Sequence, residues 1–203
     1  IAFYEMCEYE NAIECLNNAS RILEQVANIA KYVFSLFTTG LTYNSMGSYD
    51  KALDNFKKSL AGNKELGDKF GIGMNLYGVG YQYYCMGDYE ESVEYLEESY
   101  AMLKEVGVGN QWLIQPMTAL FLVYKSLGRE FDKDELDAIA SSSESFDYYI
   151  NIRLYQLLDD RLFLENAHNQ VEEISDLLET DMSNKFLSYP IPKTIVEEWE
   201  KIK

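Results

Sequence analysis

The residue that most often does chemistry at neutral pH, histidine, occurs once in the 203 residues, as His168. Metal binding and triad catalysis both need a second ligand or an oriented nucleophile beside the imidazole. One histidine supplies neither. We therefore expect His168 to be a partly exposed residue on a helix over about 161–180, without a catalytic role.

Two other patterns invite a chemical interpretation. The first is an acidic run, made of Glu90, Glu91, Glu94, Glu97 and Glu98. A calcium site needs about six to eight oxygens converging from a loop, whereas side chains on a helix fan outward, so we interpret the run as a solvated helix face. The second, residues 71–73 with two glycines, lacks the third glycine and the strand-to-helix context of a dinucleotide loop. The sequence thus predicts a chain that is not an enzyme, with no metal and no cofactor.

The charge of the chain restricts its partners. Its 17 basic and 34 acidic residues give a net charge of −17. Such a surface repels phosphate backbones and anionic lipids, so we expect neither nucleic acid nor a membrane as partner. Basic or amphipathic peptides and basic protein faces suit it better. No apolar run approaches the roughly 18 to 20 residues that span a bilayer.

Cysteine usage and the first residue bear on the cellular setting. Three cysteines without a CxxC pair favour a reduced, cytoplasmic protein over a disulfide framework. The chain starts at Ile1 rather than at methionine. We expect a fragment of a longer protein, although unseen preceding residues would explain the same observation.

A sequence pattern recurs along the first half of the chain with a period of 40 residues. The stretch 46–60 returns as 86–100, and 6–20 carries the same pattern with Cys7 at the glycine position. Apolar residues recur at gaps of three and four within each stretch, which is typical of helices with one buried stripe. A fixed period of this size indicates a repeat array.

The pattern of each repeat predicts a helical hairpin. Gly47 and Gly87 suit the left-handed residue that ends the first helix of a hairpin. We expect Ser48 and Asp88, which follow them, to be the N-caps of the second helices. Gly40 and Gly80 lie inside that helix, where glycine costs about 1 kcal/mol relative to alanine, so we expect close approach of the second helix there. The small residues that face these glycines are predicted to be Ala12, Ala52 and Ser92.

These positions resemble the tetratricopeptide repeat over about residues 1–128. The matching residues are Gly40, Tyr43, Gly47, Tyr49, Ala52, Phe56 and Ser59, and then Gly80, Tyr83, Gly87, Tyr89, Ser92, Leu96 and Ser99. The resemblance implies an all-α fold, a right-handed superhelix of antiparallel helical hairpins. The unit here is longer than the family's usual unit of about 34 residues.

We predict a single repeat domain over 1–203. Its parts are a partial repeat at 1–28, repeats at 29–67 and 68–107, a divergent repeat at 108–140, a degenerate hairpin or cap at 146–180 and a tail at 181–203. In the divergent repeat we place a helix start near Pro116, and in the tail a short helix over 194–202. The segments 185–190 and 195–199 are similar to the C-terminal repeat region of large bacterial multidomain signalling proteins, whose catalytic domains would lie outside this chain.

The resemblance also implies which residues line the concave groove of the superhelix. The first helices of the hairpins would contribute Phe34, Phe37, Leu41, Asn44 and Ser45, then Met74, Tyr77, Tyr81, Tyr84 and Cys85, and then Gln115, Thr118, Leu122, Lys125 and Ser126. Family members that bind acidic tails present lysine and asparagine there. Only Asn44 and Lys125 match in this chain, so a carboxylate clamp is disfavoured.

An aromatic groove suits an apolar or amphipathic peptide, because tyrosine offers contact area and a polar tip. The alternative is that neighbouring repeats, or the last helix with Trp199, cover these aromatics. We therefore predict a protein- or peptide-binding module, regulatory or scaffolding, in a larger signalling protein. A sensor of a small ligand or signal peptide is the second hypothesis, and self-association through Ile1, Phe3 and Met6 of the truncated first repeat is the third.

Overall fold

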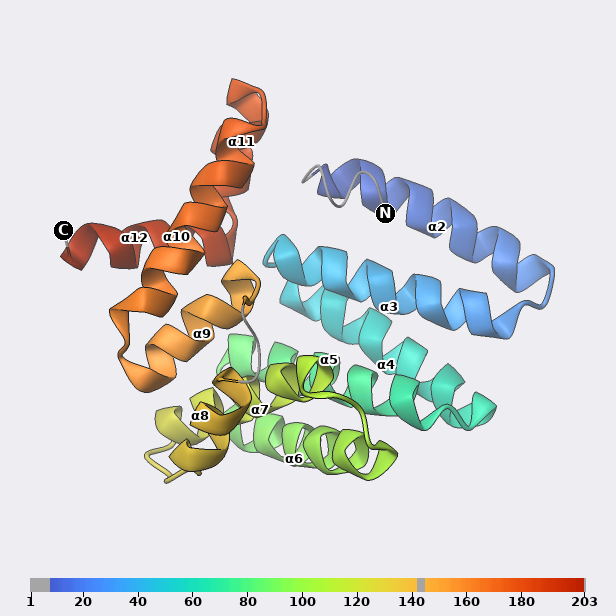
Figure 1. Ribbon diagram of the computed structural model, residues 1–203. Helices are drawn as coiled ribbons and strands as arrows, with labels where there is room; N and C mark the ends of the chain where they lie inside the picture. The colour runs from blue at the N-terminus through green and yellow to red at the C-terminus, as the bar shows by residue number, and fades with distance from the viewer. Residues whose placement is uncertain (1–7, 142–144, 203) are drawn as a thin grey trace. The chain divides into compact units, whose positions relative to one another are not determined.

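In the computed structural model, residues 8–141 and 145–202 are described, and every regular element among them is an α-helix (Figure 1). The all-α fold of consecutive hairpins is thereby confirmed. Residues 1–7 lie outside the described part of the chain. The helix end expected at 1–6 and the proposed contact surface of Ile1, Phe3 and Met6 are therefore not tested, nor is most of the loop expected at 141–143.

The chain divides into two compact units, 1–109 and 110–203. The helices of unit 1 are α2 (Tyr9–Gln25), α3 (Ile29–Ser45), α4 (Tyr49–Leu66), α5 (Lys69–Met86) and α6 (Tyr89–Val106). Within unit 1, each helix from α2 to α5 packs against the helix that follows it. The single-domain organisation stays a prediction.

The interior glycines of unit 1 make the close helix contacts that the sequence predicts. A Cβ added to Gly40 of α3 would lie 2.8 Å from the Phe56 ring, and one added to Gly80 of α5 would lie 2.7 Å from Leu96 Cγ. A Cβ added to Gly78 of α5 would lie 2.7 Å from the same Phe56 ring. Phe56 on α4 therefore fits between the backbones of two first helices, and its position explains why both need glycine.

Buried serines on the second helix of each hairpin add hydrogen bonds to the first helix. The Ser92 hydroxyl on α6 donates to the Gly80 carbonyl at 2.7 Å, and the Ser99 hydroxyl donates to the Gly73 carbonyl at 2.7 Å. Ser59 on α4 donates to the Val33 carbonyl at 2.9 Å in the same way. These bonds give the repeated serines a structural role, which the spacing alone did not assign.

The turns within the hairpins have the expected backbone conformation, but the expected side-chain caps are not formed. Gly47 and Gly87 have φ values of 74° and 89°, in the left-handed region that glycine tolerates. Ser48 and Asp88 occupy the N-cap positions that follow, yet neither side chain makes a capping hydrogen bond. The capping role predicted for both is wrong. Their backbone carbonyls instead accept the first bonds of the helices, from Ala52 and Ser92.

Unit 2 contains α7 (Asn110–Ser126), α8 (Lys133–Ala140), α9 (Tyr148–Leu158), α10 (Arg161–Asp176), α11 (Thr180–Ser188) and α12 (Pro190–Ile202). The predicted helix start near Pro116 is wrong, because α7 begins at Asn110 and contains the proline. An interior proline loses one backbone bond and costs about 3 kcal/mol. The buried residues on both sides of it, Leu113, Ile114 and Met117, keep the helix continuous through their packing.

The end of the chain is more helical than expected. The predicted helix over 161–180 stops at Asp176, and α11 forms where no helix was expected. The last helix begins at Pro190, four residues before the predicted start at Thr194. Proline is suited to the first turn of a helix because its missing N–H would have no partner there. Both Pro190 and Pro192 are therefore compatible with the start of α12.

Candidate functional site

On α3, one of the predicted groove residues is well exposed. The Phe34 side chain is 63% exposed, whereas Phe37 packs edge-on against Phe56 at a ring-centroid distance of 5.6 Å. Leu41 is also half-buried against the cluster around Phe56. Phe37 and Leu41 thus serve the core at least in part. Phe34 is the apolar residue of this face that a ligand could reach directly.

An amide bridge joins α3 to α5 at the same face. Gln82 Nε2 donates to Asn44 Oδ1 at 3.1 Å and lies 3.3 Å from the Gly78 carbonyl. The Gln82 side chain is 1% exposed, and its Oε1 atom has no hydrogen-bond partner. A buried acceptor without a donor costs about 1–3 kcal/mol. The bridge therefore places an unused acceptor beside one of the predicted groove residues.

A row of tyrosines follows one side of α5. The rings of Tyr77 and Tyr81 lie 6.0 Å apart, those of Tyr81 and Tyr84 lie 5.9 Å apart, and Tyr89 of α6 continues the row 5.8 Å beyond Tyr84. Tyr77 and Tyr81 are each 8% exposed, Met74 is buried, and Tyr84 is half-buried. The three predicted tyrosines of α5 are thus brought together in one aromatic row. Their side chains expose little area in this state.

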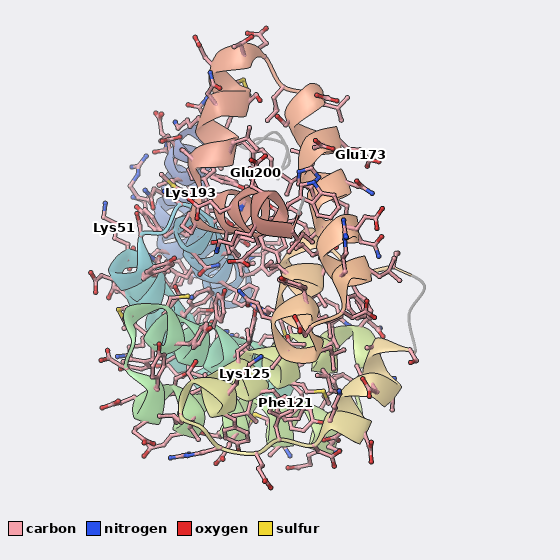
Figure 2. The ribbon with its side chains drawn as sticks, turned by 90° about the vertical axis from the view of Figure 1, so that its left-hand side faces the viewer. Lys51, Phe121, Lys125, Glu173, Lys193 and Glu200 are labelled. Atoms are coloured by element: carbon pink, nitrogen blue, oxygen red, sulfur yellow. The ribbon has the colours of Figure 1, made fainter. Side chains whose placement is uncertain are left out.

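Four of the five predicted residues of α7 take part in the packing of unit 2, to which α7 belongs. Lys125, labelled in Figure 2, donates to the Gln156 carbonyl of α9 at 2.5 Å, and Arg153 of α9 approaches the Gln115 carbonyl at 3.4 Å. The Thr118 hydroxyl donates to the Ile114 carbonyl within the helix. Leu122 is buried. Helix α9 packs along α7, so these positions contribute to the packing of unit 2.

His168 is buried rather than partly exposed, which corrects the expectation. Its ring stacks on Trp199 of α12 at 4.8 Å, and its Nδ1 atom lies 3.5 Å from Glu172 Oε2. The Arg161 guanidinium lies over the same Trp199 ring at 5.5 Å. The three side chains therefore tie α10 to α12. Among the described residues, no three His, Cys, Asp or Glu side chains are grouped as a metal would require.

Tyr49, at the start of α4, has an unusual acid–base environment. Burial, followed by repulsion from the Cys85 thiolate and a hydrogen bond to Cys85, raises the pKa of Tyr49 to about 12. A raised pKa favours the neutral phenol in the folded chain. Its contribution to stability is complete below pH 10 and is lost as the pH rises from about 10 to about 12.

We expect the difference between the alkaline absorbance titrations of the wild type and of Tyr49→Phe to show one tyrosine ionising near pH 12. Cys85→Ala removes two of the three causes, so it should move that pKa toward the ordinary value of about 10. A Tyr49 titration near pH 10 in the wild type, with the helical circular dichroism intact, contradicts this environment.

The comparisons with known proteins agree with the fold. A family model described as Tetratricopeptide repeat matches residues 1–65. No curated protein matches the chain. The crystal structure of the apo form of RapI superposes with a TM-score of 0.67 and 17% identity, over 98% of this chain and 62% of that one. The chain folds as a tetratricopeptide-like repeat array.

A second structure gives the same result for the array. A Rap protein complexed with Competence and Sporulation Factor superposes with a TM-score of 0.67 and 19% identity, over 98% of this chain and 60% of that one. The array thus spans less than two thirds of each Rap chain. No described helix is long and apolar enough to cross a membrane. The predicted likeness to large bacterial signalling proteins stays a prediction.

The repeat spacing did not predict the amide bridge between Asn44 and Gln82, because Gln82 is not one of the groove positions that the family resemblance implies. A polar residue in an otherwise apolar and aromatic helix was the available signal, since buried amides in such helices need partners. Asn44, on the neighbouring first helix, is the partner it finds.

Proposed function

We propose that this array is a non-catalytic protein- or peptide-binding module whose ligand lies along the shared face of α3 and α5. The observation that carries the proposal is the amide bridge between Asn44 and Gln82, with its unused buried acceptor. Phe34 supplies an exposed apolar contact on the same face of α3. The Rap protein complexed with a factor is an array of similar fold that takes a partner, which supports the general role.

The chemistry of this face favours a peptide with a free backbone donor and apolar side chains. The Gln82 oxygen is buried, so a peptide N–H would satisfy it once the side chains over this face open, and the tyrosine row would then offer aromatic area with hydroxyl tips. The net charge of −17 would draw a basic or amphipathic peptide toward the array. Asn44 and Lys125, the two residues of clamp type, already bond within their own units, which weighs against an acidic tail.

The other predicted groove residues, and the predicted regulatory role, are part of this proposal. Phe37, Leu41, Met74, Tyr77, Tyr81 and Tyr84 would support or contact the ligand, and the predicted α7 residues would extend the surface. A regulatory or scaffolding role in a larger cytoplasmic signalling protein is part of the same proposal. The small-ligand sensor is its alternative.

Selection of a displayed random peptide library on the full chain tests the proposal. We expect Phe34→Asp to weaken the selected peptides about tenfold, because it puts a charge on the exposed apolar contact. Leu66→Asp, an exposed apolar residue at the end of α4, is the matched control and should change affinity less than about twofold. Equal affinities for Phe34→Asp and the wild type would remove the proposed site.

A further inference from the structure

Unit 1 contains a cavity on another face of its helices. It lies between the end of α2, the start of α3 and the end of α4, and its volume is about 480 Å³. Helix α3 contributes Ile29, Tyr32, Val33 and Leu36 to it, which are spaced along one side of the helix. Phe34 is not among the lining residues. The cavity is therefore separate from the proposed peptide face.

The 40-residue repeat provides an internal control for this cavity. Gly62, which lines it, corresponds to Met102 one repeat later, and Ile29 corresponds to Lys69. Met102 is half-buried, and Lys69 Nζ lies 2.7 Å from Glu105 Oε1. The second repeat thus has an ion pair where the first has Ile29. The volume at Gly62 is occupied by Val33, since a Cβ added to Gly62 would clash with Val33 Cγ2, and Val33 corresponds to Gly73 in the second repeat.

The charged residues that line the cavity are two carboxylates, Glu24 and Glu65, and one lysine, Lys58. Neither glutamate forms an ion pair within the described residues. Lys58 pairs with Asp54 on its own helix, at 2.7 Å, so the two glutamates are the charged lining residues left without an ion pair. Glu65 corresponds to Glu105, which has Lys69 as its partner. A cation is therefore missing at Glu65 in comparison with the next repeat.

We propose that this cavity is a docking site for a peptide segment of a protein partner, in which an apolar side chain enters the cavity and an adjacent lysine or arginine pairs with Glu65. The apolar lining, chiefly Leu23, Val33 and Leu36, suits an aliphatic side chain. The partner cation takes the place that Lys69 holds in the next repeat. Peptide binding here is independent of the α3–α5 face.

A fluorescein-labelled peptide with leucine between lysine and arginine is the probe, and anisotropy of the full chain at low salt is the measurement. We expect saturable binding that Glu65→Gln weakens about three- to fivefold, the range of an exposed ion pair. Ile29→Lys should weaken it about tenfold, because the new lysine repeats the Lys69–Glu105 arrangement and occupies Glu65. The same peptide with glycine in place of leucine should bind more weakly than its parent.

Glu105→Gln is the matched control. It removes the same charge at the same repeat position, but Glu105 pairs with Lys69 and does not line the cavity. It should change affinity less than about twofold. Equal losses in Glu65→Gln and Glu105→Gln indicate general attraction to an acidic protein and overturn the proposal. So does the absence of saturable binding, an unchanged affinity in Ile29→Lys, or equal binding of the glycine peptide. Phe34→Asp should leave this probe unaffected, which separates the cavity from the α3–α5 face.

Discussion

Replacing Phe56 with alanine is expected to lower the free energy of unfolding of unit 1 by about 3–5 kcal/mol. The Phe56 side chain is 1% exposed, and its ring contacts Gly40 of α3, Gly78 of α5 and the edge of Phe37. Alanine would leave a cavity between two helices that glycine backbones cannot fill. The array would lose the contact that joins one hairpin to the next.

Urea denaturation followed by far-ultraviolet circular dichroism measures this effect. Phe34→Ala is the matched control, because Phe34 is an exposed phenylalanine and should change stability by less than about 0.5 kcal/mol. Both tryptophans, Trp112 and Trp199, belong to unit 2, so their fluorescence reports that unit separately. Similar losses in the two variants contradict the role of Phe56 between the helices.

Gly80→Ala is expected to destabilise unit 1 by about 1–3 kcal/mol, the usual cost of overpacking. The added Cβ would lie 2.7 Å from Leu96 Cγ and 3.1 Å from the Leu96 backbone nitrogen. The backbone of α6 cannot rotate away as a side chain can. The steric cost therefore exceeds the gain of about 1 kcal/mol that alanine normally brings to a helix interior.

The reverse substitution at an exposed helical site isolates helix propensity. Ala101 is exposed on α6, and Ala101→Gly should cost about 1 kcal/mol. Alanine is thus expected to be preferred at position 101 and glycine at position 80. A stabilised Gly80→Ala variant in thermal or urea unfolding contradicts the close helix approach.

The features that the sequence predicted well are those that the repeat itself enforces. Glycine at positions 40 and 80 is required by close packing against Phe56 and Leu96, and Ser92 bonds the Gly80 carbonyl, which leaves few residue types possible. The turn glycines are required by a positive φ. Such local steric demands appear directly in residue type and period.

The features that the sequence could not predict depend on contacts outside the repeat. Tyr77 and Tyr81 have the positions of groove residues, but their exposure depends on what surrounds them, and they are largely buried. Pro116 lies within a helix because packing on both sides outweighs one lost backbone bond. The pattern of 180–188 has no repeat partner, so helix α11 was missed.

The cavity illustrates a signal that was present in the sequence. Comparing positions 40 residues apart shows Ile29 against Lys69 and Gly62 against Met102. The first difference removes the ion pair of the second repeat. The second exchanges side-chain volume, because Val33 packs against Gly62 and its counterpart is Gly73. Departures from an internal repeat thus point to candidate sites, whereas agreement with it points to the scaffold.

Backbone hydrogen exchange of the full chain, with and without a peptide selected from the library, tests the central claim most directly. We predict added protection in α3 and α5, where Phe34, Asn44 and Gln82 lie, and its loss in Phe34→Asp. Protection that is confined to α2 and α4, or to unit 2, with α3 and α5 unchanged, would contradict peptide binding at the α3–α5 face.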